Sequence, residues 1–180
     1  MADDLLQRKY TLRFHQLDAS GDGVLSRADL AALAQRVIAT AGEAPTSAKA
    51  EAVRRADDGY WQAVAALAGV GEDGRISLEQ FVDALSAAND QHRLMDFAAP
   101  AITAHAALAD RNGDGVVDLQ EYRSVYTGLG ADDATIEASF RQLDVNGDGV
   151  VTLDEWLASA TDFYTSTDPH APGNLILGQF

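Results

Sequence analysis

The chain has 180 residues, and its 28 Asp and Glu residues against 13 Lys and Arg residues give a formal net charge of −15 at pH 7. Such an acidic protein repels nucleic-acid phosphates and anionic lipid headgroups, so the sequence predicts neither a nucleic-acid nor a membrane partner. The chain contains no Cys, which excludes disulfides, thiolate nucleophiles and Cys-ligated zinc. Its acidic first residues and its lack of an apolar run of membrane length favour a cytoplasmic location.

Helical segments alternate with short acidic turns along the chain. Apolar residues recur at intervals of three and four over residues 5–17, which is the spacing of one helix face. An acidic, glycine-bearing turn follows at 18–23, and the same helix, turn, helix unit returns around 110–115 and 144–149. A weaker copy lies around 69–74. These repeats predict an all-α chain of four helix-loop-helix units, with Pro100 kinking its helix or lying just after the helix start near Ala99.

Two of the turns match the EF-hand calcium loop, D-x-[DN]-x-[DN]-G-x5-E, in full, at 110–121 and 144–155. Ca²⁺ takes about six to eight oxygen ligands at about 2.3–2.6 Å, and a twelve-residue loop can aim that many oxygens at one point. Positions 1, 3, 5, 9 and 12 offer side-chain oxygens, position 9 directly or through water, and position 7 offers its backbone carbonyl. The predicted ligands are Asp110, Asn112, Asp114, Val116, Asp118 and Glu121 in the third loop, and Asp144, Asn146, Asp148, Val150, Thr152 and Glu155 in the fourth.

The first loop, 18–29, is a looser match because position 12 is Asp29 instead of Glu. The shorter carboxylate is expected to ligate through one oxygen, and coordination near six suits Mg²⁺. The loop is therefore predicted to hold a metal ion, either Ca²⁺ bound more weakly than in the other loops or Mg²⁺. Its predicted ligands are Asp18, Ser20, Asp22, Val24, Ser26 and Asp29.

The second loop, 69–80, is expected to be empty. It has Gly at positions 1 and 3 and Gln80 at position 12, so Asp73 is the only carboxylate in a ligand position. Helix-loop-helix units pair through a short two-stranded ribbon, and the second loop is expected to hold the first in shape in this way. The apolar position-8 residues predicted to face each other are Leu25 with Ile76 and Val117 with Val151.

With active loops one, three and four and a degenerate second loop, the chain resembles the sarcoplasmic calcium-binding proteins and their bacterial relatives of the calerythrin and streptomycete Cab type. The resemblance implies an all-α EF-hand fold in which two loop pairs pack into one compact globule. It also implies three bound Ca²⁺ ions and a role as a cytosolic Ca²⁺ buffer. We expect an N-terminal pair at 1–90, a C-terminal pair at 91–167 and a monomeric protein.

The C-terminal segment 168–180 is expected to be an apolar tail packed into the core. A turn-rich break at 168–173 precedes Leu175, Ile176, Leu177 and Phe180. Each such side chain gains roughly 1.5–3 kcal/mol when it is fully buried. The hypothesis is that the tail plugs the cleft between the two pairs, where a calcium sensor would bind a target helix; a frayed end is the alternative.

Two other functions remain alternatives. A Ca²⁺ sensor would expose an apolar groove to a protein partner, but such grooves tend to be Met-rich and this chain has only Met1 and Met95, so no protein target is indicated. Photoproteins that oxidise a bound luciferin share the layout of three active loops. The aromatic residues on the helix faces are more typical of core, and His105 is interpreted as a core residue with a partner. The sequence thus predicts no catalytic residue, no organic cofactor and no enzyme activity.

Overall fold

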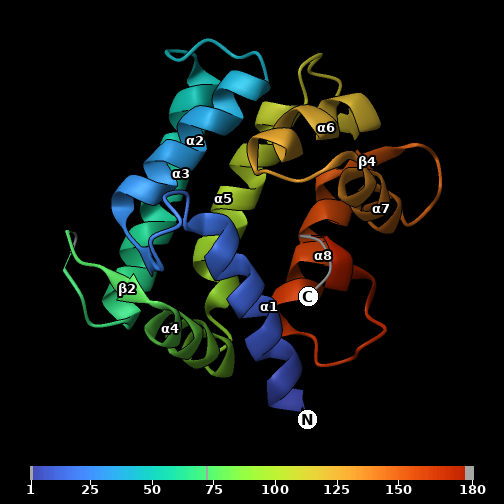
Figure 1. Cartoon of the computed structure of the whole chain (residues 1–180). Coiled ribbons are helices and arrows are strands. Elements are labelled where there is room, and N and C mark those ends of the chain that lie inside the picture. Colours follow the sequence, from blue (N-terminus) through green and yellow to red (C-terminus); the bar gives the residue numbers. More distant parts are fainter. Residues whose placement is uncertain (1, 72, 177–180) are drawn as a thin grey trace.

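The computed structural model describes residues 2–71 and 73–176, and it consists mainly of helices joined by tight loops (Figure 1). The elements in chain order are α1 (Ala2–Leu17), β1 (Val24–Leu25), α2 (Arg27–Thr40), α3 (Ala48–Leu67), β2 (Ile76–Ser77), α4 (Leu78–Asp90), α5 (Leu94–Ala109), β3 (Val116–Asp118), α6 (Leu119–Gly128), α7 (Asp133–Leu143), β4 (Val150–Thr152), α8 (Leu153–Thr165) and a 3-10 turn, η1 (Pro172–Leu175). The expected all-α class is confirmed. Helix α5 runs through Pro100, so the alternative start near Ala99 is wrong.

The helices that leave the four loops begin at the same loop position. In each, the residue at loop position 9 is the N-cap, and the side chain at position 12 accepts a hydrogen bond from the N-cap amide. Such an arrangement satisfies a backbone donor that the first helical turn leaves without a partner. The residue at position 12 is thus both the last residue of the loop and part of the first turn of the exit helix. This holds even in the second loop, where Gln80 takes the place of a carboxylate.

Two short antiparallel ribbons join the loops in pairs. Strand β1 pairs with β2 so that Leu25 faces Ile76, and β3 pairs with β4 so that Val117 faces Val151. All four side chains are buried. The predicted pairing of the loops is confirmed, and it ties the second loop to the first.

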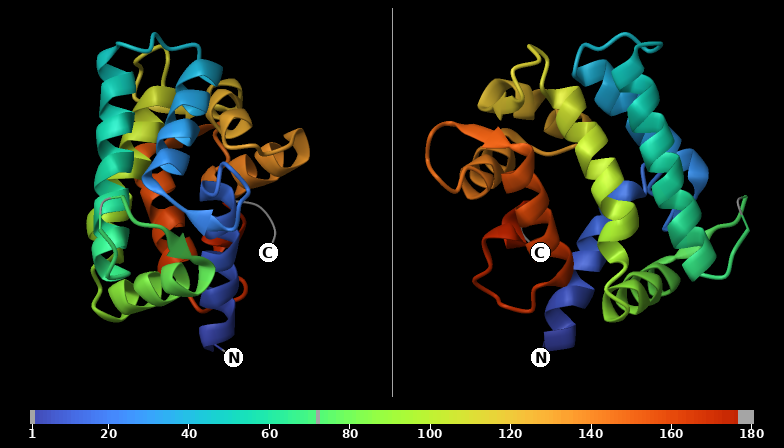
Figure 2. Two further views of the ribbon diagram at one scale, coloured as in Figure 1. Left: turned by 60° about the vertical axis from the view of Figure 1, so that its left-hand side comes forward. Right: turned by 180° about the vertical axis from the view of Figure 1, so that it is seen from behind.

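The two loop pairs share their hydrophobic cores. Helix α3 packs on α5 and α2 packs on α6, while α1 contacts both α4 and α8 (Figures 1 and 2). One buried cluster joins Phe14 and Phe81 to Phe163, and a second joins Val37 to Tyr122. Each cluster thus takes side chains from both halves of the chain, which confirms that the pairs form one globule. The division at residue 90 stays a prediction.

The C-terminal segment lies against the second half of the protein. The turn η1 packs on α7 and α8, and Ile176 is 4% exposed within the first cluster. Gly173 approaches α8 so closely that a Cβ there would lie 2.0 Å from the carbonyl oxygen of Ser159. Leu177 and Phe180 lie outside the described residues, as does the side chain of Leu175, so the plug formed by the whole tail stays a prediction. No helix in the described ranges is long and apolar enough to cross a lipid bilayer.

Lys9 is fully buried and caps the C-terminal end of α8. Its Nζ donates to the carbonyl oxygens of Ser166 at 2.8 Å and Asp162 at 3.3 Å. Burial lowers the pKa of Lys9 from 10.5 to about 8, although Asp162 and Asp168 act in the opposite direction. Between these two pKa values the folded chain has released the proton while the unfolded chain still holds it, so the free energy of unfolding should rise with pH in this window.

We expect that rise, roughly 1–3 kcal/mol between about pH 8 and 10, to be missing in Lys9→Met, which has no amine to titrate. Urea unfolding of both proteins in saturating Ca²⁺, measured across this pH range, gives the difference. Parallel pH profiles of the two proteins would contradict the role of Lys9.

Candidate metal sites

In the first, third and fourth loops, the carboxylate at position 1 is held by backbone amides of its own loop. Position 1 is Asp in the first, third and fourth loops, and both of its oxygens accept N–H groups from the turn that follows. The contacts are Asp18 with Gly21 and Gly23 at 2.9 Å each, Asp110 with Gly113 and Gly115 at 2.7 and 3.1 Å, and Asp144 with Asp148 and Gly149 at 3.1 and 3.0 Å. These bonds point both oxygens toward the interior of the loop.

The next predicted ligands are tied into the same turns. The position-5 carboxylates of Asp22, Asp114 and Asp148 accept from the amides of Val24, Val116 and Val150 at 3.1, 3.0 and 3.1 Å. The same three valines, whose carbonyls are the predicted position-7 ligands, are the first residues of β1, β3 and β4. At position 3, Ser20 donates to Asp18 at 3.1 Å, Asn112 donates to Asp114 at 2.9 Å, and Asn146 accepts from Asp148 at 2.9 Å.

In the first and third loops, the carboxylate at position 12 accepts hydrogen bonds from backbone amides near the start of the loop. Oδ1 of Asp29 accepts from the amide of Ser20 at 3.0 Å, and Oε1 of Glu121 accepts from the amides of Arg111 and Asn112 at 3.0 and 3.3 Å. Asp29 is 5% exposed and Glu121 is 8% exposed. Burial on its own would raise the pKa of Asp29, but the hydrogen bonds from Ser26 and Ser20 lower it below its usual value, which favours the ionised form.

The position-9 side chains contact the position-12 residue in all three loops. Ser26 donates to Asp29, Thr152 donates to Glu155 at 2.9 Å, and Asp118 accepts from the amide of Glu121 at 2.8 Å. Hydrogen bonds thus tie the side chains at positions 1, 3, 5, 9 and 12 to their own loop, and their role as metal ligands stays a prediction. Among the described residues, no three His, Asp or Glu side chains converge closely enough to form a cage by themselves. The predicted donor set also includes Ser, Asn, Thr and backbone oxygens, which fit a hard cation.

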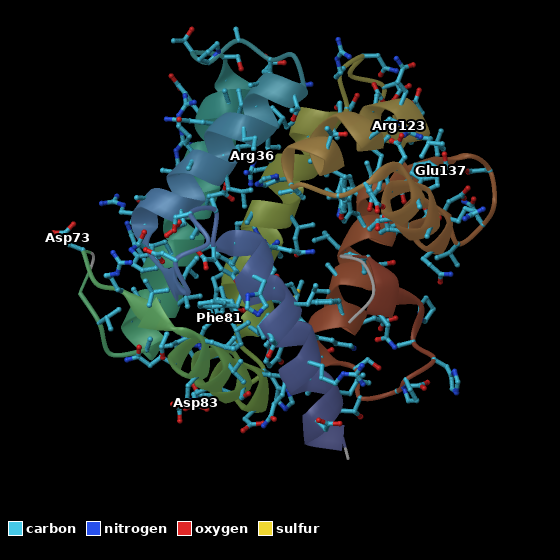
Figure 3. The ribbon with its side chains drawn as sticks, in the orientation of Figure 1. Arg36, Asp73, Phe81, Asp83, Arg123 and Glu137 are labelled. Atoms are coloured by element: carbon cyan, nitrogen blue, oxygen red, sulfur yellow. The ribbon has the colours of Figure 1, made fainter. Side chains whose placement is uncertain are left out.

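The second loop lacks this arrangement. Asp73 is exposed and lies at the tip of the loop, pointing away from the protein (Figure 3). Glu79 is exposed as well. The side chain of Gln80 accepts from the amide of Ser77 at 2.9 Å, which caps α4 and puts an amide where the other loops have a carboxylate.

Two basic residues contact the predicted sites, and sequence spacing did not single them out. Arg75, at position 7 of the second loop, forms an ion pair with Asp22 of the first loop. Lys49, in the first turn of α3, donates to the backbone carbonyl of Asp110 in the third loop. Both contacts join units far apart in sequence. The ribbon pairing gave an available signal for Arg75, because it places the second loop beside the first.

Asp29→Glu is expected to shift the first loop toward Ca²⁺. The longer side chain can supply two oxygens, which raises the coordination number that Ca²⁺ favours over Mg²⁺. Calorimetric titration with Ca²⁺ in millimolar Mg²⁺ should show tighter binding at one site.

Asp83→Glu is the matched control, because it makes the same chemical change on the exposed face of α4, away from every loop (Figure 3). It should leave the titration unchanged. An Asp29→Glu titration that matches the control would show that Asp29 is not a ligand.

The sequence of this chain is similar to those of known calcium-binding proteins. The EF-hand family model matches residues 12–34, 107–126 and 136–158, which contain the first, third and fourth loops and leave out the second. The chain is 30% identical over 167 residues to calerythrin of Saccharopolyspora erythraea, covering 91% of this chain and 92% of calerythrin.

Two solved structures are similar over nearly the whole chain. One is a Streptomyces coelicolor calcium-binding protein, described as a structural basis for calcium-mediated regulation in prokaryotes, at 27% identity and a TM-score of 0.79 over 91% of this chain and 99% of that protein. The other is the coelenterazine-binding protein of Renilla muelleri in its calcium-loaded apo form, at 25% identity and a TM-score of 0.74 over 99% and 98% of the two chains.

The loops, the ribbons and these matches define an EF-hand calcium-binding protein. Within that class, the chain belongs to the four-EF-hand family of the sarcoplasmic calcium-binding proteins, in its bacterial calerythrin branch. The resemblance inferred from the loops is thereby confirmed.

Proposed function

We propose that the protein is a cytoplasmic, monomeric Ca²⁺ buffer with three occupied loops, at 18–29, 110–121 and 144–155. One observation carries the proposal: these loops hold their first carboxylate by two loop amides, whereas the second loop has no carboxylate at that position. The amides fix the position of the oxygens before any ion arrives, so little ordering is needed on binding.

The residues of each loop have distinct tasks in this proposal. A bound Ca²⁺ ion supplies the positive charge that offsets the cluster of carboxylates. The Asp residues at positions 1 and 5 contribute charge from one side of the loop, and the position-12 carboxylate contributes it from the start of the exit helix. The second loop contributes no ligand; through the β1–β2 ribbon it supports the first.

Calorimetric titration of the metal-free protein with Ca²⁺ tests the number of sites. We expect three ions per chain, and two in Glu155→Gln, because the amide cannot supply the second negatively charged oxygen at position 12 of the fourth loop.

Asp154→Asn is the matched control for that variant. Asp154 is the neighbouring, exposed residue at loop position 11, where no ligand is predicted, so its loss of charge should leave three sites. Three sites in Glu155→Gln, or two in Asp154→Asn, would contradict the assignment.

A Ca²⁺ sensor is the second candidate, and it is supported by the calcium-mediated regulation ascribed to the Streptomyces coelicolor relative. A sensor exposes apolar surface on binding Ca²⁺, whereas a buffer with a shared core does not. A large rise in the fluorescence of an apolar dye on adding Ca²⁺ would favour the sensor. A flat or falling signal would favour the buffer.

We also propose that the protein has no catalytic activity. The luciferin-oxidising photoproteins share the layout of the loops, so incubation with coelenterazine followed by Ca²⁺ is the relevant assay. Absence of light supports the proposal, and light emission would overturn it.

A further inference from the structure

A cavity lies between the two halves of the protein, away from the four loops. Its volume is about 70 Å³, and it is partly open to solvent. Its walls are mainly apolar and come from α1, α2, α3, α5, α6 and α8 together with Ile176 of the C-terminal segment; representative residues are Leu17, Leu30, Ile102, Leu129, Phe163 and Ile176. A space of this kind suits a small organic molecule with an apolar body.

Two polar groups in the cavity wall lack hydrogen-bond partners. Tyr60 is 3% exposed, and its hydroxyl lies near Tyr164 and Arg13 but has no partner with hydrogen-bond geometry in residues 2–71 and 73–176. The same holds for Nε of Arg13, which is buried in the same wall. A buried donor left without a partner costs roughly 1–3 kcal/mol, so a ligand that satisfied both groups would recover that energy.

The wall contains the guanidinium of Arg13 and the carboxylate of Asp57. Burial by itself would lower the pKa of Arg13, but the surrounding groups, Tyr164 and Tyr60 first and then Asp57, raise it, so the guanidinium stays charged. Asp57, the carboxylate in the same wall, lies 3.1 Å from Nε2 of His105, so His105 has the expected partner, while its side chain is 14% exposed and lines the cavity. Within the described ranges Arg13 has no ion pair of its own with a carboxylate.

We propose that this cavity binds a monocarboxylate with a flat apolar body, whose carboxylate accepts hydrogen bonds from Arg13 and Tyr60. A guanidinium and a carboxylate form charge-assisted hydrogen bonds, which are the strongest of this kind in proteins. The aromatic side chains of Trp156 and Phe163 in the same wall favour a planar body over a branched one. The site is separate from the calcium loops and goes beyond the proposed buffer.

Binding of 2-naphthoate to the calcium-loaded protein tests the proposal, with the neutral 2-naphthamide as the matched ligand. We expect saturable binding of 2-naphthoate by calorimetry, with quenching of tryptophan fluorescence, and binding of 2-naphthamide about tenfold weaker. Equal affinities, or no saturable binding of 2-naphthoate at millimolar concentration, would overturn the proposal.

Variants separate the polar contact from the apolar one. Arg13→Met should weaken 2-naphthoate binding about tenfold and leave 2-naphthamide unchanged. Tyr60→Phe removes only the hydroxyl and keeps the ring, which lies edge-on to Phe97 at 5.4 Å, so it tests the site even if Arg13→Met does not fold. It should weaken 2-naphthoate binding a few-fold.

Tyr10→Phe is the control for that change. The hydroxyl of Tyr10 already donates to the carbonyl oxygen of Tyr164 at 2.7 Å, and Tyr10 does not belong to the cavity wall. Removing the Tyr10 hydroxyl should leave the affinity for 2-naphthoate unchanged. A fall in affinity equal to that in Tyr60→Phe would contradict the proposal. Calcium titration of each variant should still show the wild-type number of sites, so failure of the cavity proposal is distinct from failure of the buffer.

Discussion

Removing calcium is expected to lower the free energy of unfolding by roughly 4 kcal/mol for each site that had been held at a thousandfold excess of ion over its Kd. The physical reason lies in the loops, where carboxylates at positions 1, 5 and 12 lie within one turn and repel one another without a cation. With three Ca²⁺ ions bound, the formal net charge would change from −15 to −9. The ions bind the folded loops far better than the open chain, so binding stabilises the fold.

Thermal unfolding in excess Ca²⁺ and in excess chelator measures this effect. For a chain of this size, roughly 4 kcal/mol corresponds to a shift of roughly 8–16 °C per site. In Glu155→Gln, the rise in melting temperature on adding Ca²⁺ should be smaller by the contribution of one site. In Asp154→Asn, the rise should equal that of the wild type. Equal melting temperatures with and without Ca²⁺ would contradict a stabilising role for the ion.

Gly128→Ala is expected to lower the free energy of unfolding of the calcium-loaded protein by roughly 1–3 kcal/mol. Gly128 ends α6 directly against α2, and a Cβ there would lie 2.4 Å from Oγ1 of Thr40 and 2.7 Å from Cα of Val37. Its carbonyl oxygen also accepts from Nε of Arg36 at 2.7 Å. The two helices leave the first and third loops, so the methyl group would force apart the contact that joins the two halves.

Gly59→Ala is the matched control. Gly59 lies on the exposed side of α3, and a Cβ there would meet no atom within 4 Å. Because Ala is a better helix former than Gly, this variant should raise the free energy of unfolding by up to about 1 kcal/mol. Urea unfolding of both variants decides the matter: equal and small effects would show that the α2–α6 contact tolerates a side chain at residue 128.

The calcium loops were predictable because all of their chemistry is local. Asp110 and Glu121, for example, belong to one run of twelve residues, and the hydrogen bonds that position Asp110 come from Gly113 and Gly115 within that run. The pairing of Leu25 with Ile76 was also predictable, since apolar residues at the same position of adjacent loops form the ribbon. The start of each exit helix follows from the same twelve residues.

The residues that act across the fold were not predictable in this way. Arg75 lies 53 positions from Asp22 in the sequence and forms an ion pair with it in the structure. Lys49 and Asp110 are 61 positions apart. The ribbon between the first two loops indicates the neighbourhood of Arg75 but not its partner residue. Lys49 carries no such signal, because its contact depends on how α3 packs against the second half of the chain.

The amino-acid sequence by itself determined the number and the pairing of the loops, and it predicts the ligand set of each and an empty second loop, since spacing within twelve residues decides which oxygens can meet. Only the tertiary structure decided that α2 and α6 touch through Gly128, and that Arg13 and Tyr60 line one cavity. These contacts join helices distant in sequence, and they depend on which side chains fit together when the two halves bury their apolar faces against each other.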